Sequence, residues 1–313
     1  MELSNLRLYP DPECGELRRK LASLYNVGWD NIFVSNGSDD ILNFSFMAFC
    51  SDGGKGVVFP DISYGFYKVY ADLYRSDYRQ IPLKNDFTVN VQDYIGVGKN
   101  IVLANPNAPT GIALGISEIE RIVSSNPDNV VIIDEAYVDF GADSCYRLTE
   151  KYDNLLVVRT YSKSRSMAGA RLGFAIGNKE LIKDLEKIKF STNPYNINRL
   201  TLVAGAAAID DDGYYTENCR RICQIREYTK TELEKLGFTL TESKANFLFA
   251  QSADISGLQL YTELKRAGIL IRHFTGKRIC NYNRITVGTR EEMDAFLDAV
   301  HVILEKERKK KIQ

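Results

Sequence analysis

The 313-residue sequence lacks the features that mark several common classes of protein. It has only two histidines, His273 and His301, and they stand too far apart to supply a usual zinc site. Its six cysteines are scattered and form no C-x-x-C pair, a pattern typical of reduced thiols in a cytoplasmic protein. No apolar run approaches the roughly 18 residues of a membrane-spanning helix. We therefore expect a cytoplasmic protein without a metal site or a membrane anchor.

Charge of one sign and nucleotide-binding glycine motifs are also missing. The 40 basic and 41 acidic side chains leave a net charge of −1, which gives no electrostatic reason to bind nucleic acid or a membrane surface. The one basic run, KERKKK, lies at the end of the last predicted helix and complements its dipole. There is no G-x-x-x-x-G-K-[ST] motif and no G-x-G-x-x-G after a strand. Small molecules are the expected partners.

Between about residues 30 and 190, short apolar runs alternate with helical patterns. The runs predict buried strands at NIFVS (31–35), GVVFP (56–60), NIVLAN (100–105), NVVIID (129–134), NLLVVR (154–159) and LGFAIG (172–177). Strands that alternate with helices favour an α/β fold with a mostly parallel central sheet flanked by helices on both faces.

The pattern changes after NPYNIN (193–198). Helical patterns cover 197–208, 213–236, 256–267 and the chain from 290, and strand patterns cover 238–250, 269–272 and 284–287. We predict a large α/β domain over 28–210. Residues 1–27 and 211–313 are expected to form a smaller α+β domain.

Polar residues follow the predicted parallel strands. In such a sheet, ligands bind beyond the carboxyl ends of the strands. The residues at those ends are NGSDD, DISYGFY, NPNAPTG, DEAYVDF and RTYSK. Together they supply an anion cradle, an aromatic face, an amide, a carboxylate and an amine.

This set of groups suits pyridoxal 5′-phosphate. The aldehyde of that cofactor needs an unprotonated amine, and Lys163 follows a buried strand with no acidic neighbour in the sequence. The pyridine nitrogen stays protonated beside a buried carboxylate, and Asp134 ends the strand NVVIID. The phosphate needs a helix N-terminus and a cation, which Gly37, Ser38 and Arg171 can provide.

Further residues can complete such a site. Thr160 and Ser162 add hydroxyl groups, and Tyr64 can stack on the ring. Asn107 and Tyr137 can hydrogen-bond the phenolic oxygen of the ring. Each residue taken alone has an ordinary structural explanation, and the prediction rests on their combination.

Asp39 complicates the predicted phosphate cradle. It stands in the first turn of a predicted helix, where an acidic residue is ordinary. Its negative charge opposes a bound phosphate unless Arg171 and the backbone N–H groups outweigh it.

With these residues in view, almost the whole chain resembles the fold-type I aminotransferases that use pyridoxal phosphate, and within them the histidinol-phosphate aminotransferase family. DEAY together with SKSRSMAGAR is specific for the wider class. The similarity begins at LYPDPECGELRRKLA, and the narrower resemblance rests on NPYNIN and on the pairing of Arg272 in GILIRHF with Arg284 in RITVGTREEMDAFL.

The resemblance implies a homodimeric enzyme that moves the amino group of histidinol phosphate to 2-oxoglutarate in histidine biosynthesis. It implies that Lys163 forms the Schiff base and moves the proton, and that Asp134 pairs with the pyridinium. The other implied cofactor-binding residues are Gly37, Ser38, Asp39, Tyr64, Asn107, Tyr137, Thr160, Ser162 and Arg171, with Tyr64 also counted as catalytic.

Arg272 and Arg284 are the implied receptors of the anionic group of the substrate. This role also makes chemical sense, because guanidinium groups match phosphate and carboxylate oxygens bidentately. A pair of arginines can thus accept either a phosphorylated amine or glutamate in one site.

The sequence departs from the family pattern in two places. The family usually carries an arm with an Asn-Glu-Asn-Pro-Tyr motif, which packs across the dimer, whereas Met1 here lies only eight residues before Tyr9. The family often has two asparagines before Pro-Thr-Gly, whereas Asn107 is followed by Ala108. A threonine-phosphate decarboxylase, an aromatic aminotransferase and an inactive pyridoxal-phosphate-binding remnant therefore remain open as alternatives.

Overall fold

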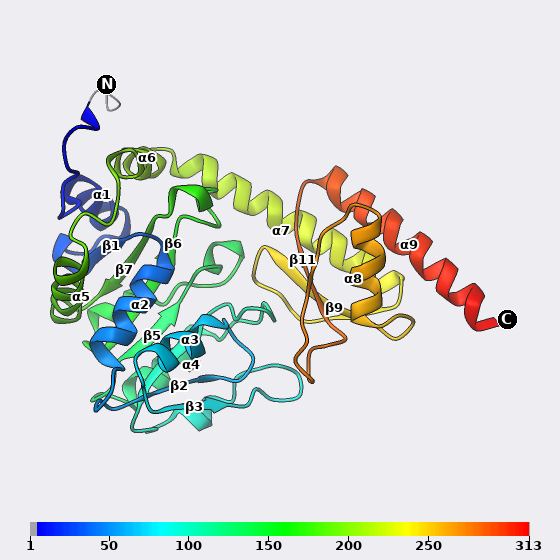
Figure 1. The fold of residues 1–313 in the computed structure, drawn as a ribbon, viewed down its shortest axis with the longest axis horizontal. Coiled ribbons are helices and arrows are strands. Elements are labelled where there is room, and N and C mark those ends of the chain that lie inside the picture. Colours follow the sequence, from blue (N-terminus) through cyan, green and yellow to red (C-terminus); the bar gives the residue numbers. More distant parts are fainter. Residues whose placement is uncertain (1–4, 313) are drawn as a thin grey trace.

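A computed structural model describes residues 5–312 of the chain, which form two sheets covered by helices (Figure 1). The larger sheet has the strand order β1-β7-β6-β5-β4-β2-β3. Its strands are β1 (Ile32–Ser35), β2 (Val57–Pro60), β3 (Tyr78–Ile81), β4 (Asn100–Ala104), β5 (Val131–Asp134), β6 (Leu155–Thr160) and β7 (Gly173–Gly177). β7 runs antiparallel to its neighbours β1 and β6, and the other neighbouring strands pair in parallel. The expected α/β fold with a mostly parallel sheet is confirmed.

Strand β3 is an element that the sequence pattern did not predict. It reads Tyr-Arg-Gln-Ile, and its two central residues are exposed. β3 pairs only with β2 at the edge of the sheet, so it has little need of apolar side chains.

The central strands are apolar throughout because both faces of the sheet are covered. Val102, Ile132 and Leu156 face a core formed with α2 (Ser38–Phe49), α3 (Phe66–Leu73) and α5 (Lys179–Thr192). Their neighbours along the strands face a second core formed with α4 (Ile116–Ser124). The alternation follows from the two-residue period of a strand.

Helix α1 (Gly15–Tyr25), which our predicted division assigns to the smaller domain, packs against the larger sheet. Leu17 and Leu21 share a core with Ile32 of β1 and Phe174 of β7. Helix α6 (Arg199–Asp210) lies beside α1 over the same strands (Figure 1). The domain boundaries themselves stay a prediction, with this contact as an argument for moving α1 to the larger unit.

The second sheet is antiparallel, with the order β10-β11-β9-β8. Its strands are β8 (Phe238–Leu240), β9 (Phe247–Ser252), β10 (Arg272–His273) and β11 (Asn283–Thr286). Helices α7 (Asp212–Lys235), α8 (Gly257–Arg266) and α9 (Arg290–Ile312) cover one face, where Leu248 and Ala250 are buried. Phe247 and Phe249 point to the opposite face and join clusters formed with the larger unit.

Short 3-10 helices complete the described secondary structure. They are η2 (Trp29–Asn31), η3 (Val91–Tyr94), η4 (Val138–Phe140), η5 (Tyr146–Glu150) and η6 (Ala168–Ala170). Among residues 5–312, no helix is long and apolar enough to cross a membrane.

Long helix α7 joins the two sheets, running from one to the other in Figure 1. Its buried Arg226 donates hydrogen bonds to the carbonyls of Phe140 and Ala245, which belong to the two different units. A further hydrogen bond connects the two units, from the hydroxyl of Thr241 to the carbonyl of Thr110. These bonds hold the face of the smaller sheet against the carboxyl edge of the larger one.

Candidate functional site

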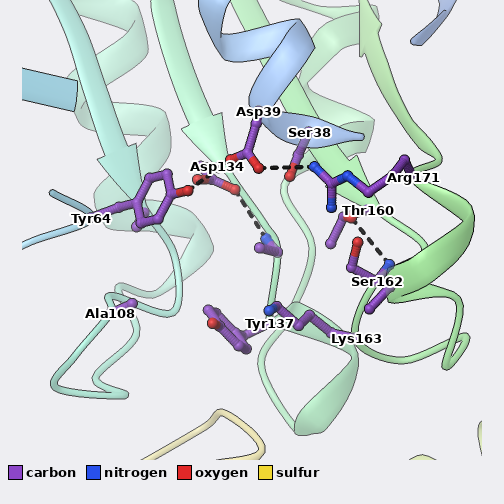
Figure 2. A pocket seen from close by; sticks show the side chains of 13 residues that line it. Ser38, Asp39, Tyr64, Ala108, Asp134, Tyr137, Thr160, Ser162, Lys163 and Arg171 are labelled. Atoms are coloured by element: carbon purple, nitrogen blue, oxygen red, sulfur yellow. Dashed lines mark hydrogen bonds and ion pairs between the residues drawn. The ribbon is translucent and has the colours of Figure 1, made fainter. Parts of the chain in front are cut away.

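A cavity opens at the carboxyl edge of the larger sheet, where the predicted polar residues meet (Figure 2). It is lined by Ser38, Asp39, Tyr64, Ala104, Ala108, Asp134, Ala136, Tyr137, Thr160, Ser162, Lys163, Ala168 and Arg171. Its volume of about 140 Å³ is close to that of a cavity of roughly 150 Å³ that holds one benzene ring. The cavity is therefore of a size for a single aromatic ring.

One corner of the cavity combines the start of α2 with Arg171. The backbone of Gly37 has a φ of 85°, and a Cβ atom there would lie 2.7 Å from Nη2 of Arg171. A Cβ atom on Gly173 would lie 2.5 Å from the backbone nitrogen of Ser38. Both glycines thus permit a close approach of Arg171 to the helix N-terminus, the arrangement that binds phosphate in many proteins. Because β7 is antiparallel to β6, Arg171, two residues before β7, lies at the same edge as Lys163.

Asp39 sits in this corner and is held by two partners. Nη2 of Arg171 lies 3.0 Å from one carboxylate oxygen, and the hydroxyl of Tyr64 donates to the other over 2.7 Å (Figure 2). The ion pair offsets the negative charge that the sequence placed near the expected phosphate. A phosphate bound here would share Arg171 with Asp39.

Asp134 lies at the end of β5 and is buried, with 5% of its surface exposed. It accepts hydrogen bonds from the hydroxyl of Tyr67 at 2.8 Å and from the backbone nitrogen of Ala136 at 3.2 Å. Burial raises the pKa of Asp134 to about 6, although the hydrogen bond from Tyr67 acts in the opposite direction. A buried carboxylate of this kind favours a cation placed against it.

Lys163 enters the cavity from the turn after β6. Its Nζ lies 5.4 Å from the centre of the Tyr137 ring. Thr160 and Ser162 line the same wall, where the backbone nitrogen of Ser162 donates to Oγ1 of Thr160 over 3.1 Å. The amine and the buried carboxylate of Asp134 therefore face one ring-sized space.

A polar network supports the Lys163 turn from behind. The hydroxyl of Ser164 donates to the carboxylate of Asp139 over 2.5 Å, and Asp139 is in turn paired with Arg159. Arg159 is buried and also contacts Glu135 at 3.2 Å. Burial acts to raise the pKa of Asp139, but Arg159 and Ser164 hold that pKa below its ordinary value. This network restrains the residue next to Lys163.

The donor set of the cavity fits pyridoxal 5′-phosphate. It offers an amine for the aldehyde, a buried carboxylate for the ring nitrogen, and a helix N-terminus with an arginine for the phosphate. Tyr64 and Tyr137 supply aromatic rings and hydroxyls at the wall. Of the predicted cofactor-binding residues, the structure brings together Gly37, Ser38, Asp39, Tyr64, Asp134, Tyr137, Thr160, Ser162, Lys163 and Arg171.

Asn107 is the predicted residue that the structure does not place in the cavity. Its amide nitrogen donates to the carbonyl of Ile62 and the hydroxyl of Thr110, and its oxygen accepts from the hydroxyl of Ser63. The next residue, Ala108, lines the cavity instead. The expected contact between Asn107 and the ring oxygen is therefore corrected, because the turn points that side chain into the protein. Of the two residues predicted to bond the phenolic oxygen of the ring, Tyr137 lines the cavity.

Tyr67 is a residue of the site that the sequence reasoning missed. It is fully buried, and its hydroxyl bonds to Asp134. It lies in the first turn of α3, and its ring contacts the Tyr64 ring edge-on at 5.6 Å.

Arg272 and Arg284 lie directly opposite each other on the β10–β11 hairpin. Two like charges in such a cross-strand pair repel, which an anion between them would relieve. Arg284 is half-buried, and its guanidinium carbon lies 5.0 Å from the centre of the Phe247 ring. Phe247 in turn contacts Tyr137 edge-on, with ring centroids 5.0 Å apart. The rings of Phe247 and Tyr137 thus connect Arg284 to Lys163 through a chain of contacts.

Neither arginine of this pair is engaged by a carboxylate in the described part of the chain. The Nε atom of Arg284 is buried without a hydrogen-bond partner among residues 5–312. An unsatisfied buried donor of this kind is costly unless a ligand completes it.

The chain is similar in sequence to known aminotransferases. The sequence profile of the family described as "Aminotransferase class I and II" matches residues 2–300. A histidinol-phosphate aminotransferase from Brachyspira hyodysenteriae is 50% identical over 301 residues, covering 96% of this chain and 85% of that protein. A histidinol-phosphate aminotransferase from Clostridium botulinum is 44% identical over 302 residues, with the same shares covered.

Solved structures show the same fold. The histidinol-phosphate aminotransferase from Clostridium acetobutylicum superposes with a TM-score of 0.89 at 25% identity, covering 97% of this chain and 92% of that one. The enzyme of the same name from Sinorhizobium meliloti, solved in complex with pyridoxal-5′-phosphate, gives a TM-score of 0.88 at 20% identity. That match covers 97% of this chain and 84% of the other.

Proposed function

This chain belongs to the class I and II aminotransferase family, and we propose that it transfers the amino group of histidinol phosphate to 2-oxoglutarate with pyridoxal 5′-phosphate as its cofactor. The proposed reaction is a step of histidine biosynthesis. The proposal is supported by relatives of 43–50% identity that carry the name histidinol-phosphate aminotransferase.

The observation that carries the proposal is the meeting of three groups around one cavity. Lys163 provides the amine, Asp134 provides a buried carboxylate, and Arg171 provides a cation beside the N-terminus of α2. These are the groups that a pyridine aldehyde with a phosphate arm requires. The three groups support binding of pyridoxal 5′-phosphate, and the names of the relatives support histidinol phosphate as the substrate.

Pyridoxal 5′-phosphate supplies an aldehyde that condenses with amines and a ring that accepts the electron pair left when the substrate Cα loses a proton. We propose that Lys163 would hold the aldehyde carbon of the cofactor and, once freed by the substrate amine, would take the proton from the substrate Cα. Asp134 would keep the ring nitrogen protonated, and Tyr137 would donate a hydrogen bond to the phenolic oxygen. Tyr64 lines the cavity and would stack on the ring.

The remaining proposed contacts hold the phosphate arm of the cofactor. They come from the backbone at Gly37 and Ser38, from the hydroxyls of Thr160 and Ser162, and from Arg171, which Asp39 orients through its ion pair. Restraint by protein groups leaves the reacting carbon in one place, and this lowers the entropic part of the barrier.

Arg272 and Arg284 are the proposed receptors for the anionic group of the substrate. Histidinol phosphate offers a phosphate and glutamate offers a second carboxylate, and a pair of guanidinium forks matches both. The repulsion between the two opposed arginines, together with the unpartnered Nε of Arg284, supports an anion at this place.

We also propose a cytoplasmic homodimer, as is expected from the family likeness and the scattered cysteines. The exposed apolar side chains of Phe66, Val69 and Leu73 on α3, beside the cavity, offer a surface that a second copy can cover. Sedimentation of the cofactor-loaded protein at about twice the mass of 35.4 kDa would support the dimer.

The test of the proposed function is a spectral titration of the cofactor-loaded protein. Histidinol phosphate should convert the absorption band of the bound aldehyde, and 2-oxoglutarate should restore it with release of glutamate. Carbon dioxide released from a phosphorylated amino acid without a need for 2-oxoglutarate would instead indicate a decarboxylase. A protein that binds the cofactor but responds to neither histidinol phosphate nor glutamate would contradict the proposal.

Lys163→Ala is the variant that tests the assigned amine. Borohydride reduction followed by mass spectrometry should place the cofactor on Lys163 of the wild type, whereas the variant should bind the cofactor without a covalent adduct. Lys179→Ala, at the exposed start of α5, is a control outside the cavity and should behave as the wild type. An adduct on another lysine would refute the assignment.

A further inference from the structure

Arg278 lies at the tip of the hairpin that carries Arg272 and Arg284, in the loop between β10 and β11. Its guanidinium crosses to the larger unit and makes three hydrogen bonds there. Nη1 lies 3.0 Å from the carboxylate of Asp61, and Nη2 donates to the carbonyls of Leu83 and Lys84 at 2.8 and 2.7 Å. In Figure 1 this hairpin reaches down to the loop that follows β3.

The partner of Arg278 is itself firmly held. Asp61 follows β2, and its second carboxylate oxygen accepts from the backbone nitrogen of Leu83 at 2.9 Å. The backbone nitrogen of Asp61 donates to the carbonyl of Ile81. Asp61 therefore ties the end of β2 to the end of β3 and offers Arg278 a fixed acceptor.

Asp61 is also the start of the segment that leads into the cofactor cavity. Ile62 and Ser63 bond to the amide of Asn107, and Tyr64 lines the cavity and bonds to Asp39. A displacement at Asp61 would thus be felt at the cavity wall, three residues further along the chain.

Apolar contacts also pack the hairpin tip against the larger unit. Ile279 packs with Ile62, Leu83 and Phe87 in a cluster shared by both units. Such contacts have no preferred direction, whereas the three hydrogen bonds of Arg278 define one position of the tip.

We propose that Arg278 is a positioning residue that fixes the β10–β11 hairpin against the Tyr64 segment, so that Arg272 and Arg284 receive the substrate anion at a set distance from Lys163. This inference rests on the proposed function of the two arginines. An anion receptor that is held before binding loses less freedom on binding, and it places the reacting amine correctly for the cofactor.

The proposal predicts a loss that is selective for substrates with the anionic group. In cofactor-loaded Arg278→Gln, the rate constant kcat/KM for histidinol phosphate should fall by about tenfold or more, while that for histidinol, which lacks the phosphate, should change by less than about twofold. The side chain of Arg278 is 35% exposed, so its replacement opens no core cavity, and the thermal midpoint and the affinity for the cofactor should stay near those of the wild type.

Four further variants separate positioning from general damage. Asp61→Asn should show part of the same selective loss. The double variant should be no worse than Arg278→Gln, because the two substitutions remove the same contact between Arg278 and Asp61. Arg278→Lys should recover part of the rate, since an ammonium can reach some of the same oxygens. Arg266→Gln, which removes an exposed ion pair with Glu263 on α8, is the matched control and should have no effect.

Inorganic phosphate gives a second readout that does not depend on the identity of the amine. Titration calorimetry of the cofactor-loaded protein should show phosphate binding that is lost in Arg284→Gln and about tenfold weaker in Arg278→Gln. Equal phosphate affinity in Arg278→Gln and the wild type, or an equal fall in rate for histidinol phosphate and histidinol, would overturn the role of Arg278. A wild-type protein that binds phosphate but does not react with histidinol phosphate would overturn the proposed function instead, and the calorimetry would still decide the role of Arg278.

Discussion

Replacing Asp134 with asparagine should make the cofactor-free protein more stable while it disables the proposed reaction. The carboxyl group is buried, and burial raises its pKa from 3.8 to about 6. Each tenfold change in a protonation equilibrium is worth about 1.4 kcal/mol, so ionised Asp134 costs the folded protein about 3 kcal/mol at pH 8. Asparagine has no charge to bury, but it accepts only with one oxygen, and the weaker bonding to Tyr67 and Ala136 offsets about 1 kcal/mol.

The net gain of about 2 kcal/mol has a defined dependence on pH. Because the pKa of Asp134 is higher in the folded than in the unfolded chain, the cost is absent well below pH 4 and complete above about pH 6. At pH 5 roughly half of the cost of ionised Asp134 remains. With an unfolding entropy of roughly 0.7 kcal/mol per kelvin for a chain of this length, the melting temperature should rise by about 3 °C at pH 8 and by about 1 °C at pH 5.

Thermal unfolding of the cofactor-free proteins at the two pH values is the assay, and Asp139→Asn is the control. The pKa of Asp139 is held below its ordinary value by Arg159, so that variant should lose stability instead of gaining it. After loading with pyridoxal phosphate, Asp134→Asn should transfer the amino group slower by orders of magnitude. An unchanged or lower melting temperature at pH 8 would refute the reasoning about burial, and a normal rate would refute the role at the ring nitrogen.

Three other changes follow from the same geometry. Gly37→Ala should lower the melting temperature and weaken cofactor binding, because its φ of 85° strains any other residue and the new Cβ would meet Arg171; cofactor affinity equal to the wild type would contradict this. Tyr67→Phe should raise the pKa of Asp134 further, since it removes a bond to the ionised form, and the pH profile of the half-reaction should move upward; a profile that stays in place would count against the bond. Arg226→Ala should cost about 2 kcal/mol of unfolding free energy, measured by urea titration, because it removes the guanidinium donor of the Ala245 carbonyl and leaves the Phe140 carbonyl with the weak thiol donor of Cys223, and a loss below about 1 kcal/mol would be inconsistent with that.

The strands and the residues that follow them could be predicted from the sequence because both depend on local patterns. Apolar runs of four to six residues between helical patterns indicate buried parallel strands, and the carboxyl ends of such strands meet at one edge. Lys163 and Asp134 follow or end two of these runs, so the local pattern is enough to predict that they lie close together. Strand β3 was missed because an edge strand does not need an apolar pattern.

The turn NPNAPTG illustrates what a sequence pattern leaves undecided. Both Asn107 and Ala108 lie in the turn that follows β4, and the amide of Asn107 was predicted to be the group that faces the ring. The structure turns Asn107 toward Ile62 and Ser63 and leaves Ala108 in the cavity wall. The direction of a side chain in a turn depends on the partners that packing brings within reach, and those partners lie more than 40 positions away.

The sequence by itself determined the order of strands and helices, the chemistry at the strand ends and the family to which the chain belongs. Those properties follow from local periodicity and from residue types that one cofactor requires. Only the tertiary structure decided that α1 covers the larger sheet, that Arg272 faces Arg284, and that Arg278 bonds to Asp61 across 217 positions of the chain. Contacts of that separation arise from the docking of two sheets, and no local window of the sequence contains both partners.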